Sequence, residues 1–257
     1  MRNYILRKLI GAVPVVFGVI TLVFILTTIV PGDPARIMVG QRVDPQTIEK
    51  IRQEMGLDRP LIVQYFNFIK DVIVFDLGKS YRNNMAVSEI IWSRLPYTSR
   101  LAFFSISFAV VVGIPLGIIS ALKQNSFIDH GVRIFSVIGT SAPTFWIALL
   151  SVVLFCMVLD WIPGTGTGSG ELIYYVLPSI VLGLRPAALI ARLTRSSMLD
   201  TIRQNYIRTA RAKGLSLRQV IVKHALRNSL IPVVTIAGIE LAGLLCGVVV
   251  IETVFSI

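Results

Sequence analysis

The sequence predicts an all-α protein that crosses a membrane five times. Of its 257 residues, 54% are hydrophobic and only 15% are charged, and the mean hydropathy is +0.74. This composition leaves too few polar residues to cover the surface of an ordinary soluble domain. The chain also contains five apolar stretches of about 20 residues, the length that a helix needs to cross a bilayer. We therefore expect an integral membrane protein built from helices.

The five predicted spans divide the chain into segments of very different length. The first span is too long for the core of a signal peptide. A Pro-Gly-Asp-Pro turn follows it in place of a small-residue cleavage site, so we expect this span to remain as an anchor. The predicted spans cover residues 10–30, 100–122, 132–159, 172–191 and 229–251.

The net charge of +11 predicts the orientation of these spans, because Lys and Arg concentrate in cytoplasmic loops. Three basic residues precede the first span, within residues 1–9. Two lie around the loop at 123–131, none lies in residues 160–171, and nine lie in residues 192–228. The N-terminus and the loops at 123–131 and 192–228 are therefore predicted to be cytoplasmic. The segments predicted to lie outside are residues 31–99, 160–171 and 252–257.

The long outer segment is predicted to contain two short helices. The stretch DPQTIEKIRQEMGL begins with Asp44 as an N-cap and Pro45 at the first helical position, and Gly56 lies where a helix commonly ends. A second amphipathic helix is predicted around residues 65–71, and the Asp-Leu-Gly turn at 76–78 ends it.

The cytoplasmic loop at 192–228 has the pattern of two helices joined at a tight corner. Residues 201–213 contain neither Pro nor Gly, and Gly214 after them suits the left-handed conformation that ends many helices. Ser216 is followed at the third position by Gln219, which is the pattern of a capping box at the start of a new helix. The sequence therefore predicts a helix, a corner and a second helix that continues into the last span.

Three interpretations of this loop compete. Its nine basic residues, beside Asp200 as the single acid, are suited to fix the orientation and to attract anionic lipid headgroups. Helix-turn-helix DNA-binding proteins share the outline, but spans at both ends would keep a recognition helix out of a groove, so no nucleic acid is expected. The third interpretation is a docking element for a cytoplasmic partner. Two apolar side chains at the corner, Leu215 and Leu217, favour this interpretation.

The same loop resembles the cytoplasmic Glu-Ala-Ala loop of ABC-importer permeases. Ala210 and Gly214 match the general pattern of that loop, while Arg208 stands in place of the Glu. The form YIRTARAKGLS, at 206–216, is similar to that of the B-type permease subunit in the peptide and nickel branch. The other matching motifs are GDPA at 32–35, GLDRP at 56–60, DLGKS at 76–80, RLPYT at 94–98, SAPTFW at 141–146, LPS at 177–179, RLTRSSMLD at 192–200 and ETVFS at 252–256.

The resemblance implies the type I ABC importer permease fold and ATP-driven import of di- or oligopeptides across a bacterial inner membrane. Nickel or another small solute is the alternative substrate within the family. The family usually has six spans, so we expect its sixth to be missing here. The implied partners are a homologous C-type permease, two cytoplasmic ABC ATPase subunits and a periplasmic or lipoprotein substrate-binding protein. The residues expected to couple to the ATPase are Tyr206, Thr209, Ala210, Ala212, Lys213, Gly214, Leu215, Ser216 and Leu217.

No catalytic residue, cofactor or metal site is expected. The chain contains no GxxxxGK[ST] phosphate loop, so ATP is expected to bind to another subunit. Cys156 and Cys246 lie within apolar runs, and neither His130 nor His224 belongs to a cluster of ligating residues. Two alternatives of other classes remain: a channel or secondary transporter that works without an ATPase, and a membrane scaffold. A secondary transporter commonly shows an internal repeat, and none is visible in this sequence.

Two ionisable residues, Arg185 and Glu240, lie within predicted spans, where charged groups are costly and usually functional. A rise of about 1.5 Å per residue places them roughly 10 Å and 16 Å deep, so the two side chains could reach each other. They form either an ion pair that stabilises helix packing or part of a translocation path that meets the charged ends of a peptide. Pro178 and Pro186 also predict a kink in the fourth span.

Overall fold

The computed structural model describes residues 2–29, 44–54, 56–80, 83, 85–163, 166, 171–246 and 248–256. Within these residues the regular elements are helices, apart from one isolated antiparallel bridge between Lys79 and Ala86. The all-α prediction is therefore confirmed. The GDPA motif lies outside the described residues. The chain divides into two compact units, residues 1–94 and 95–257, and each is described by itself.

The first unit contains one long apolar helix and two short ones. The helices are α1 (Arg2–Ile29), α3 (Pro45–Glu54) and α4 (Leu61–Ile73). The helix α1 meets α4 through Tyr65, whose hydroxyl lies 2.7 Å from Thr21 Oγ1 and whose ring packs edge-on against Phe24 at 5.2 Å. The most apolar part of α1 is otherwise exposed throughout. A helix that is apolar on all sides suits contact with lipid.

Both short helices predicted for the outer segment are present. The helix α3 begins at Pro45 as expected, and Gly56 after it has a φ of +66°. The second helix, α4, is longer than the stretch predicted at 65–71. After α4, the Asp-Leu-Gly turn forms as predicted, with the Gly78 N–H donating to Asp76 Oδ1 at 3.0 Å.

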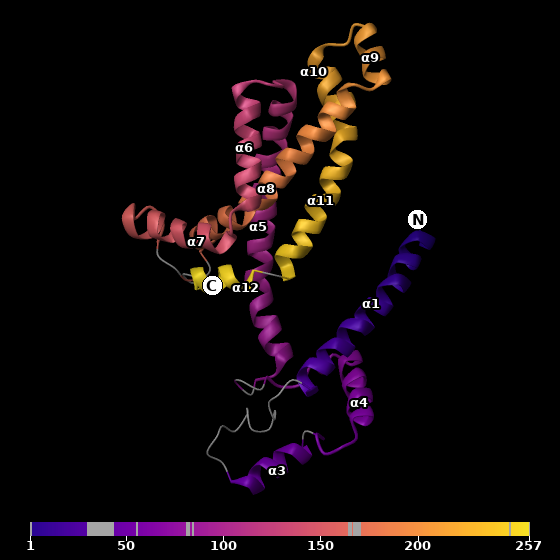
Figure 1. Cartoon of the computed structure of the whole chain (residues 1–257), viewed down its shortest axis with the longest axis vertical. Coiled ribbons are helices and arrows are strands. Elements are labelled where there is room, and N and C mark those ends of the chain that lie inside the picture. The colour runs from indigo at the N-terminus through magenta and orange to yellow at the C-terminus, as the bar shows by residue number, and fades with distance from the viewer. Residues whose placement is uncertain are drawn as a thin grey trace. The chain divides into compact units, whose positions relative to one another are not determined.

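The second unit is a bundle in which α8 (Ile173–Ile202) is the most buried helix. The helices α6 (Phe127–Ser141) and α11 (Arg227–Cys246) pack along α8, as Figure 1 shows. The helix α5 (Val87–Leu122) also packs against α8, with Gly113 and Gly117 facing it at close range. A Cβ at Gly117 would lie 2.5 Å from the Thr194 Cβ and 2.6 Å from the Ala191 carbonyl oxygen. Such small-residue contacts are typical of helices packed within a membrane.

The predicted third span, residues 132–159, is not one straight helix. The helix α6 ends at Ser141, and α7 (Thr144–Ser151) and the π-helix η1 (Val152–Val158) follow after a bend of 101°. Proline disfavours a helical conformation in the residue before it, and Ala142 before Pro143 has an extended backbone with φ −72° and ψ 133°. Four described helices are long and apolar enough to cross a membrane, and the bent pair makes a fifth only if it counts as one span.

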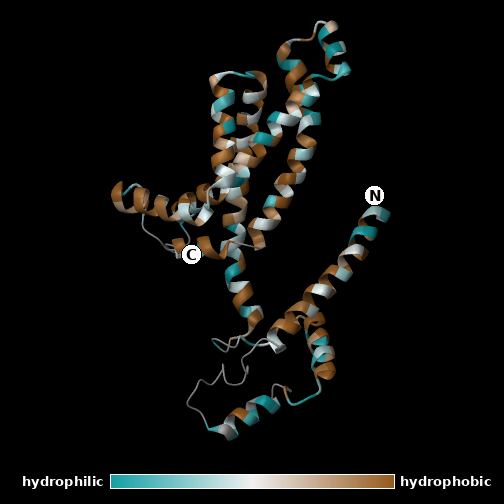
Figure 2. Cartoon of the chain, viewed as in Figure 1, coloured by the Kyte–Doolittle hydropathy of each residue, from teal (hydrophilic) through white to brown (hydrophobic). Residues whose placement is uncertain are grey.

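Several helices differ in length from the predicted spans. The helix α1 begins at Arg2 instead of residue 10, and α11 ends at Cys246 instead of residue 251. The helix α5 begins at Val87 instead of near residue 100, and α8 continues to Ile202 instead of ending at 191. The helix α8 continues through both Pro178 and Pro186. Helices can continue past the bilayer surface, so the boundaries of the membrane segments stay predictions. Figure 2 shows hydrophobic residues along α5, α8 and α11, and hydrophilic residues gathered around α9 (Asn205–Ala212).

Candidate functional site

The predicted helical corner is present between α8 and α11. The helix α9 is followed by Gly214, which has a φ of +77° that only glycine adopts without strain. Ser216 and Gln219 form the predicted capping box at the start of α10 (Leu217–Gln219). The π-helix η3 (Val220–Leu226) then leads into α11. The first helix begins at Asn205, not at residue 201, because the extended Gln204 separates it from α8.

We call residues 205–219 the corner. Its inner side packs on the ends of α5 and α8, where Met198 of α8 is fully buried. The Tyr206 hydroxyl also accepts a hydrogen bond of 2.8 Å from the amide nitrogen of Asn228 at the start of α11. Ala210, one of the predicted coupling residues, is only 7% exposed and faces this inner cluster. The other buried members of the cluster are Ala121, Ile207, Val220 and Ala225.

The outer side of the corner combines apolar and basic side chains. Leu217 is 65% exposed and Leu215 is 37% exposed, so the tip presents the two apolar side chains that the sequence predicted there. Such a surface suits a partner that offers an apolar groove with an acidic rim. The remaining predicted coupling residues are exposed: Tyr206, Thr209, Ala212, Lys213, Gly214 and Ser216. The exposed basic residues around the tip are Arg208, Arg211, Lys213, Arg218 and Lys223.

A cavity of about 460 Å³ lies where the chain bends between α6 and α7. Its walls come from this bend, from α8, from α11 and from α12 (Val249–Phe255). The SAPTFW motif contributes Pro143, Thr144 and Phe145 to the lining, so the bend that the sequence did not predict shapes this cavity. The volume is within the usual range for sites that bind small molecules.

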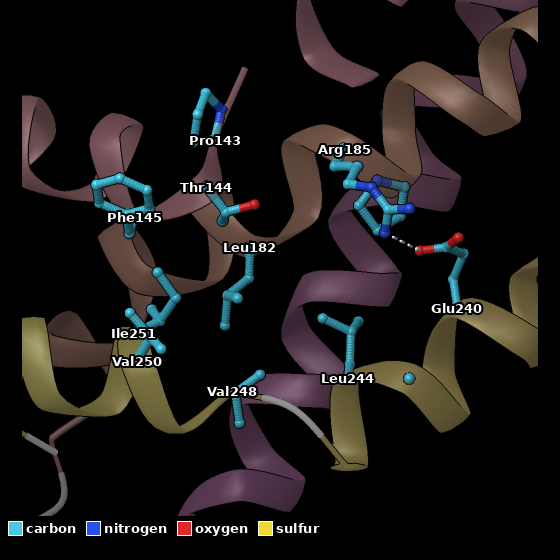
Figure 3. A pocket seen from close by; sticks show the side chains of 12 residues that line it. Pro143, Thr144, Phe145, Leu182, Arg185, Glu240, Leu244, Val248, Val250 and Ile251 are labelled. Carbon is cyan, nitrogen blue, oxygen red and sulfur yellow. Dashed lines mark hydrogen bonds and ion pairs between the residues drawn. The ribbon is translucent and has the colours of Figure 1, made fainter. Parts of the chain in front are cut away.

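Arg185 and Glu240 face each other at one side of this cavity (Figure 3). Arg185 Nη1 lies 3.4 Å from Glu240 Oε2, which confirms that the two side chains reach each other. The contact is single and long, and the Arg185 side chain is 56% exposed while that of Glu240 is 14% exposed. This geometry leaves most of the hydrogen-bonding capacity of the guanidinium unused by Glu240. The pair can therefore offer a positive and a negative charge to a ligand.

A second ion pair, between Asp129 and Arg195, was not among the predicted site residues. Arg195 of α8 donates from Nε to Asp129 Oδ1 at 2.6 Å and from Nη2 to Oδ2 at 2.8 Å. Ser120 donates to Oδ1 at 2.6 Å, and the backbone N–H of Asn125 donates to Oδ2 at 2.9 Å. Arg133 of α6 adds a longer contact of 3.5 Å. The Asp129 carboxylate is fully buried, and four hydrogen bonds satisfy it.

The sequence held only a partial signal for this pair. Ser126 caps α6 by accepting from the backbone N–H of Asp129, so the two residues mark a helix start. An acid in the first turn of a helix is common because it complements the helix dipole. Nothing local distinguishes Asp129 from such an ordinary residue, and its partner Arg195 is 66 residues away.

The two histidines lie beside these sites, His130 next to Asp129 and His224 in η3 after the corner. His130 is exposed and contacts Arg133, with 3.1 Å between His130 Nδ1 and the Arg133 guanidinium. Cys156 and Cys246 both carry free thiols. In the part of the chain that the structure describes, no three His, Cys, Asp or Glu residues come together in a way that could hold a metal ion.

Comparisons with known proteins identify the family. Residues 113–257 match the model for the binding-protein-dependent transport system inner membrane component, and residues 1–102 match the model for its N-terminal part. The chain is 39% identical to the dipeptide transport system permease protein DppB of Alkalihalophilus pseudofirmus, over 100% of this chain and 85% of the relative. It is 41% identical to the glutathione transport system permease protein GsiC of Escherichia coli K12 and to that of Salmonella choleraesuis, over 100% of this chain and 83% of each relative. The chain therefore belongs to the inner membrane components of binding-protein-dependent transport systems, as a multi-pass permease subunit of an ABC importer.

Proposed function

We propose that this permease forms part of the path by which an ATP-driven importer moves di- or oligopeptides across a bacterial inner membrane. The observation that carries the proposal is the cavity with Arg185 and Glu240 at one side and apolar residues around them. A peptide with free ends carries a carboxylate that suits Arg185 and an ammonium group that suits Glu240. The names of the relatives agree with this substrate class, since glutathione is a tripeptide.

Nickel, the alternative substrate, is less well suited to this cavity. A protein site for nickel usually provides imidazole, thiolate or several carboxylate ligands. The described lining residues include one carboxylate, that of Glu240, and no His or Cys. The guanidinium of Arg185 beside it would also repel a cation.

We infer that the corner is the docking site for a cytoplasmic ABC ATPase, which hydrolyses ATP for transport. Leu215 and Leu217 would enter an apolar groove of the ATPase, while the surrounding basic residues steer the approach. The inner cluster around Met198 fixes the corner on the ends of α5 and α8, so that the tip does not move independently of the bundle. The same proposal gives the orientation of the chain in the membrane. The corner lies in the cytoplasm with the ATPase, and the predicted spans place the N-terminus on the same side.

The remaining partners follow from the family. Its description as a binding-protein-dependent system supports an external substrate-binding protein. We propose that a homologous second permease completes the path and that two ATPase subunits drive the pair. The proposed membrane segments are those of the sequence prediction, with the third divided at Pro143.

The experiment changes Leu215 and Leu217 together to Asp, which places two charges in an apolar contact without partners. The complete transporter is expressed, the copurifying ATPase is measured, and ATP-dependent uptake of radiolabelled dialanine into membrane vesicles is followed. We expect normal membrane insertion, because the spans are untouched, but loss of both the ATPase and uptake. Lys223→Gln, a basic residue beyond the corner, is the matched control and should lower uptake only modestly. Wild-type uptake with the ATPase bound to the double variant would show that the corner is only a charged loop.

A further inference from the structure

We propose that Asp129 and Arg195 are positioning residues that transmit movement of the corner to α5 and α6. This inference rests on the proposed docking of an ATPase at the corner. Residues 123–126, which we call the α5–α6 turn, lie at the same end of the second unit as the corner (Figure 1). The ion pair joins this turn to α8 close to the corner.

The carboxylate of Asp129 is a junction between three helices. It lies in the first turn of α6 and binds Arg195 of α8 through two parallel hydrogen bonds. It also accepts from Ser120 near the end of α5 and from the Asn125 N–H in the α5–α6 turn. A bidentate contact between a guanidinium and a carboxylate fixes both distance and orientation. The ends of α5, α6 and α8 are therefore held in one register.

The corner reaches Arg195 through Met198, only three residues further along α8. A rise of about 1.5 Å per residue separates the two along the helix axis by roughly 4.5 Å. Met198 is fully buried against Ile207 and Val220, from α9 and η3. A force on α9 therefore presses on the turn of α8 that carries Met198, and the adjacent turn carries the ion pair.

Apolar packing alone would hold these helices together less specifically. Apolar contacts are not directional, so they fix the orientation of two helix ends less strictly than a bidentate ion pair does. A buried ion pair is seldom more stable than well-packed apolar residues of similar volume, but it fixes geometry. An ion pair whose carboxylate is fully buried, with every partner in place, is thus better suited to transmit a displacement than to add stability.

The test changes both residues together, Asp129→Asn with Arg195→Gln, so that neither charge is left buried alone. The complete transporter is purified into proteoliposomes, and uptake of radiolabelled dialanine is divided by the ATP hydrolysed. We expect the ATPase to remain bound and hydrolysis to continue, while the ratio of dialanine to ATP falls about tenfold, the size of a typical coupling between sites. Arg133→Gln is the matched control, because Arg133 also contacts Asp129 but is exposed and joins no second helix. Its ratio should equal that of the wild type.

A wild-type ratio in the double variant would overturn the proposal, and so would uptake and hydrolysis that fall together with the amount of assembled transporter. If the double variant does not assemble, Arg195→Lys keeps the charge but gives up the bidentate contact. An intermediate ratio then supports the proposal, and a wild-type ratio overturns it. Should the wild type import neither dialanine nor a longer alanine peptide, the proposed substrate class is wrong. The stimulation of ATP hydrolysis by the binding protein is then measured instead, and equal stimulation of the wild type and the double variant overturns the proposal for Asp129 and Arg195. Retention of the ATPase by the Leu215 and Leu217 double variant would refute docking at the corner separately.

Discussion

Two arginines of α8 pair with carboxylates on neighbouring helices, and the two pairs differ in almost every property. Arg195 makes two hydrogen bonds of 2.6 Å and 2.8 Å to the fully buried Asp129 of α6. Arg185 makes one contact of 3.4 Å to Glu240 of α11, and more than half of its side chain is exposed. The first pair also has two further donors on its carboxylate. The second lies beside a cavity.

The difference in burial and hydrogen bonding indicates that one ion pair stays intact while the other can open. Ordering and desolvating a buried bidentate pair costs free energy, and the attraction between the charges offsets this cost only while the pair remains intact. Asp129 and Arg195 are therefore suited to a contact that does not open. A single long contact at the edge of a cavity is easily exchanged for a ligand, because little is lost when it opens. The helix α8 thus carries a closed ion pair next to the corner and an ion pair that a ligand can replace next to the proposed path.

The largest effect is expected for Asp129→Asn alone. It leaves Arg195 without its counter-charge in a mostly buried site, so the free energy of unfolding should fall by about 3 kcal/mol. Thermal unfolding of the purified transporter in detergent measures this loss. Asp200→Asn, at an exposed position near the end of α8, is the control and should have little effect. Equal losses for the two variants would mean that the buried pair adds nothing specific.

A smaller loss is expected for Ser120→Ala. This change removes one hydrogen bond of 2.6 Å to the Asp129 carboxylate but leaves the ion pair in place. Hydrogen bonds to charged groups contribute about 2 kcal/mol, so the loss should be clearly below that of Asp129→Asn. The same unfolding measurement applies, with Ser107→Ala on the same helix as the control. A loss as large as that of Asp129→Asn would show that the carboxylate depends on the serine more than on Arg195.

A double-mutant cycle on Arg185→Gln and Glu240→Gln, measured by thermal unfolding, should give a coupling energy of only about 1 kcal/mol. The coupling is small because one partner is largely exposed. Dialanine uptake should fall in each single variant, and the double variant should lose less than the sum of the two losses. Strictly additive losses would show that the two residues serve separate sites. A coupling energy of about 3 kcal/mol, as large as the loss expected for Asp129→Asn, would remove the distinction between the two pairs.

The smallest effect is expected for Arg133→Gln. Arg133 contacts the same carboxylate one helical turn away, but at 3.5 Å and with nearly half of its side chain exposed. Pairs of this kind stabilise a helix by about 0.4 kcal/mol, so the unfolding temperature should barely change. Arg195→Gln provides the comparison in the same experiment. If both variants lost equal stability, burial would not be what distinguishes the contacts of Asp129.

The features that depend on neighbouring residues could be predicted from the sequence. The apolar stretches predicted the spanning helices, and the basic loops predicted an orientation, which stays a prediction. Gly214 and the capping box of Ser216 with Gln219 predicted the corner, because each acts within three or four residues along the chain. The bend after α6 also had a local signal in Pro143, but the apolar run across it favoured a single continuous span.

Most contacts between distant side chains could not be predicted from the sequence, because they depend on how the helices pack. Asp129 looked like an ordinary helix-start acid until α8 brought Arg195 to it across 66 residues of sequence. Ala210 was expected to couple to the ATPase, yet it is buried in the inner cluster with Met198. The sequence predicted that Arg185 and Glu240 could reach each other. It did not predict the cavity beside them, because the cavity depends on the bend at Pro143. Periodicity fixes the faces of each helix, but the rotation and crossing of the helices decide which faces come together.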